Sequence, residues 1–349
     1  MAQDDIWDPG GSRSPSGLLR SFRRIGAPCG KRRGYNRRRL EVGLDGGKGH
    51  GPRGGAPHGV SRGATRLVSP PASLAGRLRR RDGPPLVIAH RGGRTLAAEN
   101  TLAAAERALA VGADLWEFDV QLTRDAVPIL LHDETLERTT DAAARFPDRA
   151  PWRADAFKVD EVRTLDAGSW FSLPDGSRPF TGERVPTLEE ALRWTVERGI
   201  DVNVELKGTS RTIFLSRRGR RLAERTVALL RRFDILPRAI VSSFDPALLR
   251  HVKRITPEVP CALLLLSLPA DPVAALVEAR AAVPVNAVAI PPEAFHAEVA
   301  DALGRAGVRT LVWTVNTEEG MVRLAREPFV AGIVTDDPAL LGEVLARLA

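Results

Sequence analysis

Short runs of Val, Ile and Leu recur eight times between residue 84 and the end of the 349-residue chain, and this repeat constrains the fold more than any other feature. Amphipathic stretches of ten or more residues separate most of the runs, and neighbouring parallel strands need such a crossover between them. The repeat is therefore typical of successive β-α units. The predicted strands are Leu86–His90, Leu115–Val120, Val202–Leu206, Ala239–Ser243, Pro260–Leu265, Ala287–Ile290, Thr310–Thr314 and Gly332–Thr335.

Helices are predicted in the stretches between the strands, where apolar residues recur at helical spacing. Eight β-α units within residues 84–349 match a TIM (β/α)8 barrel, a fold of about 250 residues. The predicted fold class is thus α/β, with an open doubly wound sheet as the alternative. The expected helices are Thr101–Val111, Leu188–Arg198, Arg220–Phe233, Pro246–Ile255, Pro272–Ala281, Ala294–Ala306, Glu318–Ala325 and Pro338–Leu348.

One region interrupts the repeat after the second predicted strand. Residues 126–131 have the composition of a further strand, and residues 134–186 then run long and irregular before the next helix. Long insertions in compact domains are usually functional or disordered. Because this inserted loop region carries Trp152, Trp170 and Phe171, we expect it to pack over the barrel mouth.

Residues 1–83 differ in composition from the rest of the chain. They hold 18 Lys and Arg against 6 Asp and Glu, a net of +12, whereas the remainder holds 33 against 37, a net of −4. Such an Arg-, Gly- and Pro-rich segment cannot bury enough apolar surface to offset its ordering entropy. We therefore predict a disordered basic N-terminal extension before one domain at residues 84–349.

The charge of the extension does not by itself identify a partner. The overall net charge of +8 comes from residues 1–83, so it does not indicate a specific nucleic-acid-binding domain. A tail that binds anionic surfaces or nucleic acid is the alternative to a dispensable segment.

Cysteine and hydropathy patterns limit the compartment. Cys29 and Cys261 are the only cysteines, which excludes a disulfide framework and a cysteine-based metal site. The sequence has no transmembrane segment, since no apolar stretch reaches about 18 residues, and no signal peptide, since no apolar region follows the N-terminal arginines. We expect a cytoplasmic protein, and its oligomeric state stays unknown.

Histidines end two of the apolar runs. The active sites of TIM barrels lie at the C-terminal ends of the strands, so polar residues at these positions are the candidates for chemistry. The first run ends in His90 and Arg91, and the run that begins near residue 126 ends in His132. A single histidine at a strand end is more often a core or surface residue, but here two imidazoles and a guanidinium are expected at the same face.

Acidic residues accompany them on two strands. Glu117 and Asp119 are two residues apart, so their side chains project to the same side of the strand, and Glu205 with Lys207 repeats the spacing. Buried carboxylates are costly unless they bind a cation or a basic partner. Three of them suit a hard cation, Mg²⁺ or Ca²⁺, better than zinc, and Lys207 can face a phosphate. On its own, such an acidic pair is as often a solvated strand face.

The same region carries a series of motifs in one order: His90–Gly92, Glu99–Thr101, Gly112–Asp114 with Glu117–Val120, His132–Asp133, Arg138–Thr140, Pro186–Glu190, Glu205–Lys207, Ser242–Phe244, Trp313–Asn316 and Thr335–Pro338. In order and spacing this series resembles the glycerophosphodiester phosphodiesterase family over roughly residues 86–340. Two turns depart from the family, since Arg124–Ala126 stands where Lys-Asp-Gly is usual and Asp141–Ala142 where Asn-Gly is common. These changes alter turns that favour positive φ.

The resemblance implies an enzyme of lipid and glycerol metabolism that hydrolyses glycerophosphodiesters to sn-glycerol 3-phosphate and an alcohol. It implies that one divalent cation, Mg²⁺ or Ca²⁺, is held by three carboxylates, that two histidines act as acid and base, and that basic residues contact phosphate. In this sequence the metal ligands are Glu117, Asp119 and Glu205, the acid/base pair is His90 and His132, and the substrate- or phosphate-binding residues are Arg91, Lys207 and Trp313.

Some roles in the motif series have two interpretations. Glu99 is expected to support the metal or orient His90, but capping of a helix by Asn100 or Thr101 is an equally good use of that motif. The nucleophile is water or the glycerol 2-hydroxyl, and neither histidine is assigned as the acid. The alternative function is a phospholipase D-type enzyme acting on lysophospholipids or sphingolipids. A less favoured one is a catalytically silent barrel that binds phosphate or membranes.

Overall fold

The computed structural model describes residues 74–79, 83–208, 215–267, 286–306 and 309–349. Eight parallel strands close into a barrel, because β1 pairs with both β9 and β2. This closure confirms the TIM barrel and excludes the open doubly wound sheet. The strands are β1 (Leu86–Ala89), β2 (Leu115–Leu122), β4 (Asp201–Leu206), β5 (Ala239–Ser243), β6 (Cys261–Leu264), β7 (Ala287–Ile290), β8 (Arg309–Val312) and β9 (Val330–Thr335).

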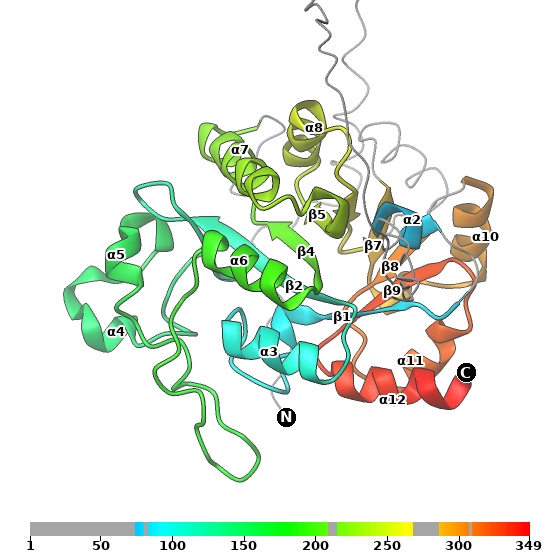
Figure 1. Ribbon diagram of the computed structural model, residues 1–349, viewed down its shortest axis with the longest axis horizontal. Helices are drawn as coiled ribbons and strands as arrows, with labels where there is room; N and C mark the ends of the chain where they lie inside the picture. The colour runs from blue at the N-terminus through cyan, green and yellow to red at the C-terminus, as the bar shows by residue number, and fades with distance from the viewer. Residues whose placement is uncertain (1–73, 80–82, 209–214, 268–285, 307–308) are drawn as a thin grey trace, which may run out of the picture.

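Helices surround the barrel on its outside (Figure 1). Their positions follow the predicted stretches closely, and the predicted helix at 272–281 lies outside the described residues. The helices of the repeat are α3 (Leu102–Ala110), α6 (Leu188–Arg198), α7 (Arg217–Arg232), α8 (Pro246–Ile255), α10 (Ala297–Ala306), α11 (Glu318–Ala325) and α12 (Pro338–Leu348).

Local capping signals fix where several helices begin. At α6, Thr187 accepts a hydrogen bond from the backbone of Glu190, and the Glu190 carboxylate accepts one from the backbone of Thr187. Asp245 and Asp337 cap α8 and α12, each followed by a proline at the first helical position.

Strand alternation divides the core into two layers. In β2, Trp116 and Phe118 face outward and pack against the helices, whereas Leu115 faces inward with side chains of the other strands. Glu117 and Asp119 share the inward side of Leu115, since side chains alternate along a strand. Glu117 and Asp119 therefore point into the barrel, above its apolar interior and towards the C-terminal ends of the strands.

A short helix, α2 (Leu74–Arg79), corrects the predicted extent of the N-terminal extension. Leu74 and Leu78 are fully buried among the inward-facing apolar residues of the barrel, and Arg77 forms ion pairs with Asp114 and Asp201. Both aspartates lie where β2 and β4 begin, so α2 covers the end of the barrel opposite the site. The prediction of disorder does not hold for these six residues, and residues 1–73 and 80–82 lie outside the described part of the chain.

The insertion after β2 builds a core of its own. The strand expected near residue 126 is β3 (Pro128–Leu130), antiparallel to β2, and the short helices α4 (Ala142–Arg145) and α5 (Val159–Val162) follow. Trp152 packs against the buried apolar cluster that forms the core of the insertion. Trp170 and Phe171 instead pack on Ala97 and Ala98, which lie between β1 and α3, and on Ala104 of α3. The insertion is thus attached beside the barrel mouth by its aromatic residues.

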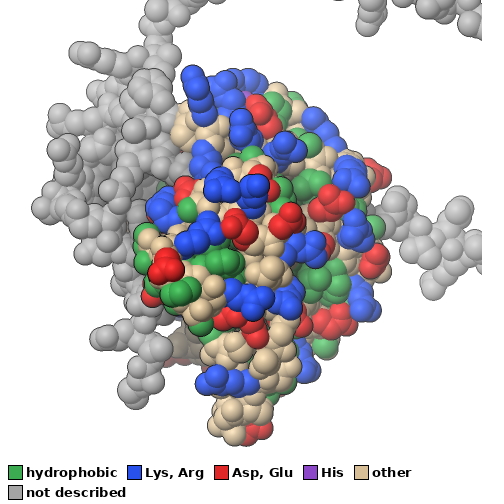
Figure 2. Space-filling model, turned by 90° about the vertical axis from the view of Figure 1, so that its left-hand side faces the viewer, with side chains coloured by type: hydrophobic (Ala, Val, Ile, Leu, Met, Phe, Trp, Pro, Cys, Tyr) green, Lys and Arg blue, Asp and Glu red, His purple; other side chains and the backbone are tan. Residues whose placement is uncertain are grey.

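The surface on the insertion side is mixed in charge. Figure 2 shows Lys and Arg side chains interspersed with Asp and Glu over this face. This mixture agrees with the nearly balanced composition after residue 83. Among the described helices, none is both long enough and apolar enough to cross a bilayer.

Candidate active site

Three buried carboxylates meet at the C-terminal ends of β2 and β4. Asp119 pairs in register with Glu205, and Glu117 lies one inward position earlier on β2. One oxygen from each of the three side chains lies within 4.8 Å of the others. The structure thus brings together the three residues that the sequence proposed as metal ligands.

The charge state of this cluster fits a cation. Burial raises the pKa of Glu117 well above its usual range, and the charges of Asp119 and Glu205 raise it further. Burial also opposes ionisation of Asp119, but Lys207 and His132 outweigh it and hold the pKa of Asp119 well below its usual value. Three oxygen donors that repel one another in a buried space could hold a divalent metal ion, which would offset the repulsion.

Two basic side chains border the carboxylates. The Lys207 Nζ lies 2.8 Å from Asp119 Oδ1 and 2.7 Å from Glu205 Oε1. The Arg91 backbone N–H donates to Glu117 Oε2 at 2.8 Å, and its guanidinium Nε lies 3.4 Å from Asp119 Oδ2. Both predicted phosphate contacts are therefore beside the carboxylate cluster.

The turn after β1 has an unusual backbone that places Arg91. Arg91 adopts φ +50° and Gly92 φ +86°, the left-handed region that glycine enters without strain. A Cβ atom at residue 92 would lie 2.6 Å from the Cβ of Ala104 in α3. The glycine is thus required both by its conformation and by the close approach of α3.

His90 contacts an aspartate that follows β9, the strand that pairs with β1 to close the barrel. Its Nδ1 lies 2.6 Å from Oδ1 of Asp336, which follows β9, and Asn316 Nδ2 donates to Asp336 Oδ2 at 2.8 Å. Burial lowers the pKa of His90, and the charge of Arg91 adds to the lowering. Burial would raise the pKa of Asp336, but the bond to His90 brings it to about 2.

His132 has a carboxylate partner of the same kind. Its Nδ1 lies 2.6 Å from Oδ1 of Asp133, and Arg138 donates from Nε to Asp133 Oδ2 at 2.6 Å. Burial lowers the pKa of His132, with Asp119 acting against the lowering and Lys207 with it. The backbone N–H of Leu131, the residue before His132, donates to the carbonyl of Asp119 at 3.0 Å, so His132 follows a segment that pairs beside the carboxylate cluster.

The residues of the Glu99–Thr101 motif have three separate tasks. Thr101 caps α3 by accepting a hydrogen bond from Ala104, as the capping alternative expected. Asn100 donates to Asp119 Oδ2 at 2.9 Å and accepts from the backbone N–H of Asp119 at 3.1 Å. Neighbouring Glu99 is almost fully buried and binds guanidinium groups instead of imidazole.

Trp313 lies at the end of β8, where its indole and the ring of Phe244 meet edge to face with centroids 5.3 Å apart. Within the described part of the chain its buried Nε1 has no hydrogen-bond partner. Trp313 therefore lies at the strand ends of the barrel beside Phe244, where the sequence placed it.

The turn at Arg124–Ala126, one of the two that depart from the family, has a residue with positive φ. Ala126 adopts φ +62°, and its backbone N–H donates to the carbonyl of Thr123 at 3.0 Å. The expectation of an altered turn geometry is therefore not met at this residue, which takes the conformation that glycine favours despite its Cβ.

The sequence indicated no role for three residues that hold the site, Asp133, Arg138 and Asp336, and for Asn100 it indicated only helix capping. Each stands inside a motif that was recognised, so the signal was present. The partners of Asn100 and Asp336, however, lie on other segments of the chain, and Arg138 contacts Glu99 39 residues away. Only the folded structure identifies which group each residue contacts.

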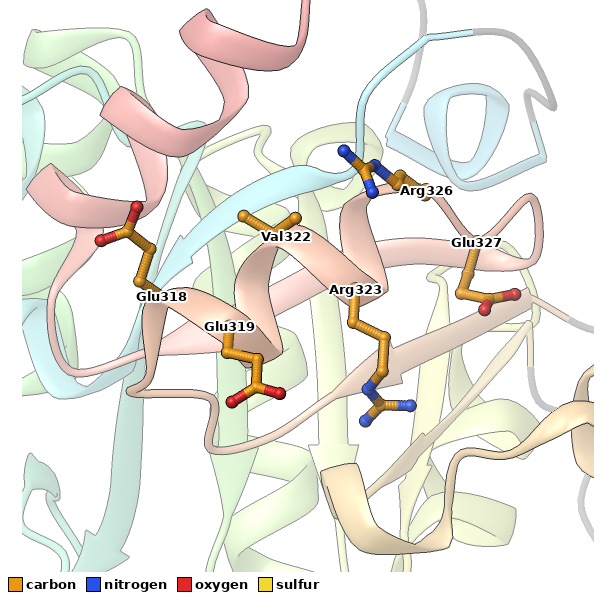
Figure 3. Close-up of a pocket in the computed structure, with 6 residues that line it drawn as sticks. All are labelled: Glu318, Glu319, Val322, Arg323, Arg326 and Glu327. Carbon is orange, nitrogen blue, oxygen red and sulfur yellow. The ribbon is translucent and has the colours of Figure 1, made fainter.

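A hollow elsewhere on the surface lacks the candidate catalytic side chains of this site. It lies along the outside of α11 and is lined by Glu318, Glu319, Val322, Arg323, Arg326 and Glu327 (Figure 3). The Arg323 guanidinium in this hollow is engaged, since it donates to the carbonyls of Phe295 and Pro292. None of the lining residues is a histidine, and none belongs to the carboxylate cluster.

The closed barrel, with clustered carboxylates and two carboxylate-paired imidazoles at its strand ends, defines the class of this protein as a TIM-barrel enzyme. Residues 90–340 match the model of the glycerophosphoryl diester phosphodiesterase family. The chain belongs to this family.

Known proteins are similar to this chain in both sequence and fold. A glycerophosphodiester phosphodiesterase of Caldanaerobacter subterraneus subsp. tengcongensis is 34% identical over 73% of this chain and 96% of its own length. A glycerophosphodiester phosphodiesterase structure from Agrobacterium tumefaciens is 27% identical, with a TM-score of 0.60 over 74% of this chain and 99% of the other. A phosphodiesterase of Oleispira antarctica, solved with the product sn-glycerol-3-phosphate, is 26% identical, with a TM-score of 0.62 over 75% and 97% of the two chains.

Proposed function

We propose that this protein hydrolyses glycerophosphodiesters to sn-glycerol 3-phosphate and an alcohol, using a divalent cation and two histidines. The observation that carries the proposal is the cluster of Glu117, Asp119 and Glu205, with their ligand oxygens within 4.8 Å. The product bound by the Oleispira antarctica relative supports the same substrate class.

Glu117, Asp119 and Glu205 would hold one cation, Mg²⁺ or Ca²⁺, since all three offer oxygen ligands. When bound, the ion supplies positive charge that offsets the negative charge developing on the phosphoryl oxygens. Arg91 and Lys207 border the cluster and add fixed positive charge for the phosphate. Phosphodiester anions repel nucleophiles, so this neutralisation is the first requirement of catalysis.

The two imidazoles provide proton transfer. His90 and His132 each engage Nδ1 with an aspartate, which leaves Nε2 of each ring to exchange a proton with the substrate. One imidazole takes a proton from the attacking hydroxyl, and the other donates a proton to the departing alkoxide. Trp313, beside Phe244 at the barrel mouth, would pack against the glycerol of the substrate.

The test is an assay of glycerophosphocholine, glycerophosphoethanolamine and lysophosphatidylcholine with and without a chelator. We expect hydrolysis of the first two substrates, loss of activity with chelator and recovery with Mg²⁺ or Ca²⁺. Activity that survives complete metal removal would contradict the cation. Faster cleavage of lysophosphatidylcholine would favour the phospholipase D-type alternative, and absence of all hydrolysis would favour a silent barrel.

The acid/base assignment is tested separately by His132→Ala. Removal of a general acid or base costs about 10²- to 10⁴-fold in rate. Calorimetric titration with the metal serves as the control for site integrity, because neither imidazole belongs to the carboxylate cluster. A variant that binds metal and retains near-wild-type turnover would overturn the role of His132.

A further inference from the structure

Arg138, a residue of the insertion, forms paired hydrogen bonds with two carboxylates at once. Its Nε and Nη2 atoms donate to the two oxygens of Asp133 at 2.6 and 3.1 Å. Its Nη1 and Nη2 atoms donate to the two oxygens of Glu99 at 3.0 and 2.7 Å. The planar guanidinium can make such double contacts in only one orientation, so it fixes the distance between the two carboxylates.

Glu99 is the immobile side of this bridge. Its side chain is 1% exposed, and Arg91 and Arg94 donate to it at 2.8 and 3.2 Å in addition to Arg138. A buried carboxylate with three guanidinium partners has little freedom to move. Glu99 is therefore an anchor built into the barrel, on the segment between β1 and α3.

Asp133 is the side that needs an anchor. Its side chain is 28% exposed and that of His132 is 29% exposed, so water has access to both. The Asp133 carboxylate also bonds His132 Nδ1 at 2.6 Å, and the orientation of the imidazole depends on it. Without a second contact, this carboxylate could rotate into solvent and take the ring with it.

We propose that Arg138 is a positioning residue: it ties the Asp133 carboxylate to the buried Glu99 and thereby fixes the His132 imidazole for catalysis. This role rests on the proposed function, because it concerns the acid/base group of the same site. The insertion thereby has a role in the site: it supplies Arg138, which orients a catalytic group without contacting the carboxylate cluster.

The same anchor reaches towards the second histidine more weakly. Arg94, which donates to Glu99, lies 3.6 Å from Asp336 Oδ2, and Asp336 holds His90. This contact is longer than a hydrogen bond, and Asp336 has its own support from Asn316 at 2.8 Å. Loss of Arg138 is therefore expected to disturb His132 and to leave His90 in place.

The experiment compares Arg138→Met and Arg138→Lys with Arg149→Met as the matched control. Arg149 belongs to the same insertion and has a similar exposure of 31% against 33%, and it pairs with Glu161 instead of an active-site carboxylate. We measure kcat and KM for glycerophosphocholine, metal affinity by calorimetry, and the ring signals of His90 and His132 by ¹⁵N NMR.

We expect Arg138→Met to lower kcat about 10- to 100-fold, as loss of groups that orient catalytic ligands typically does, with KM changed by less than about threefold. The His132 Nδ1–H signal shifts or broadens, the His90 signal stays, and metal affinity is unchanged. Arg138→Lys keeps one of the two carboxylate contacts and recovers part of kcat, whereas Arg149→Met retains wild-type kcat.

Unchanged kcat and His132 signals in a folded Arg138→Met protein would overturn the proposal, as would an equal loss of kcat in Arg149→Met. If the wild-type protein hydrolyses no glycerophosphodiester, the proposed function fails. The NMR comparison of His132 then still decides whether Arg138 positions the ring.

Discussion

Asp336 Oδ1 lies 2.6 Å from Nδ1 of His90, and this contact joins the residue after the last barrel strand to the residue after the first. Because β1 and β9 are neighbours only in a closed barrel, the pair exists only once the barrel has closed. The fold and the orientation of a proposed catalytic group are thus completed by the same pairing.

The first prediction concerns this pair. Asp336→Asn removes the negative charge that orients and stabilises the imidazole, so kcat should fall about 100-fold, within the range that a general acid or base contributes. Asp337→Asn is the control, because asparagine caps α12 about as well as aspartate does. Steady-state kinetics with glycerophosphocholine measure both variants, and equal activity in the two would contradict the orienting role of Asp336.

The second prediction is the pH dependence of activity. Burial lowers the pKa of both His90 and His132 from 6.5. A general base must be neutral to accept a proton, so activity is lost as pH falls through the lowered pKa. The acid limb of kcat/KM should therefore have its midpoint below 6.5, as measured across the acid range with saturating metal. A midpoint at or above 6.5 would show that the imidazoles are not shifted in this direction.

The third prediction concerns stability at low pH. Burial would raise the pKa of Glu99, but the bonds from Arg138 and the charge of Arg91 lower it from 4.5 to about 2. A lowered folded-state pKa stabilises the protein above pH 4.5, by about 3 kcal/mol for this shift, and the contribution disappears as pH falls towards 2.

Denaturant unfolding of the wild type and Glu99→Gln tests this sign. The difference in unfolding free energy between the two proteins should be largest near neutral pH and shrink on acidification. A difference that stays constant down to the lowest pH at which both proteins fold would contradict the ionised, arginine-bound state of Glu99.

The fourth prediction separates two N-terminal truncations. Removing residues 1–73 leaves α2, whereas removing 1–83 deletes Leu74 and Leu78 from the barrel interior and Arg77 from its ion pairs. Loss of a single buried leucine side chain costs about 2 to 5 kcal/mol, so the longer truncation should be at least about 3 kcal/mol less stable. Urea unfolding of both proteins measures the difference, and equal midpoints would show that α2 contributes nothing.

The sequence predicted the barrel because its signals are local. Strands and helices alternate with their own periodicities, and the carboxylate pair was visible because alternation along β2 forces Glu117 and Asp119 to one side. Helices α6, α8, α11 and α12 match the predicted bounds because capping residues or prolines mark their starts.

The missed features depend on distant partners. Helix α2 has only two buried leucines within a basic segment, and its Arg77 contacts Asp201, 124 residues away. The task of Glu99 is set by Arg138 from the insertion, 39 residues away, which no local pattern indicates. Such assignments require the spatial arrangement that the closed barrel and the attached insertion provide.

The glycine at position 92 has a wider effect than its size suggests. A methyl group there would collide with Ala104 and displace the first turn of α3, and the segment just before that turn carries both Asn100, which grips Asp119, and Glu99. A substitution of Gly92 would therefore disturb the position of Asp119 and of the arginines bound to Glu99. Through Arg138 and Asp133 it would also disturb the imidazole of His132 on another loop. The absence of a Cβ atom at Gly92 thus allows the close approach of α3 that aligns side chains with no contact to Gly92 itself.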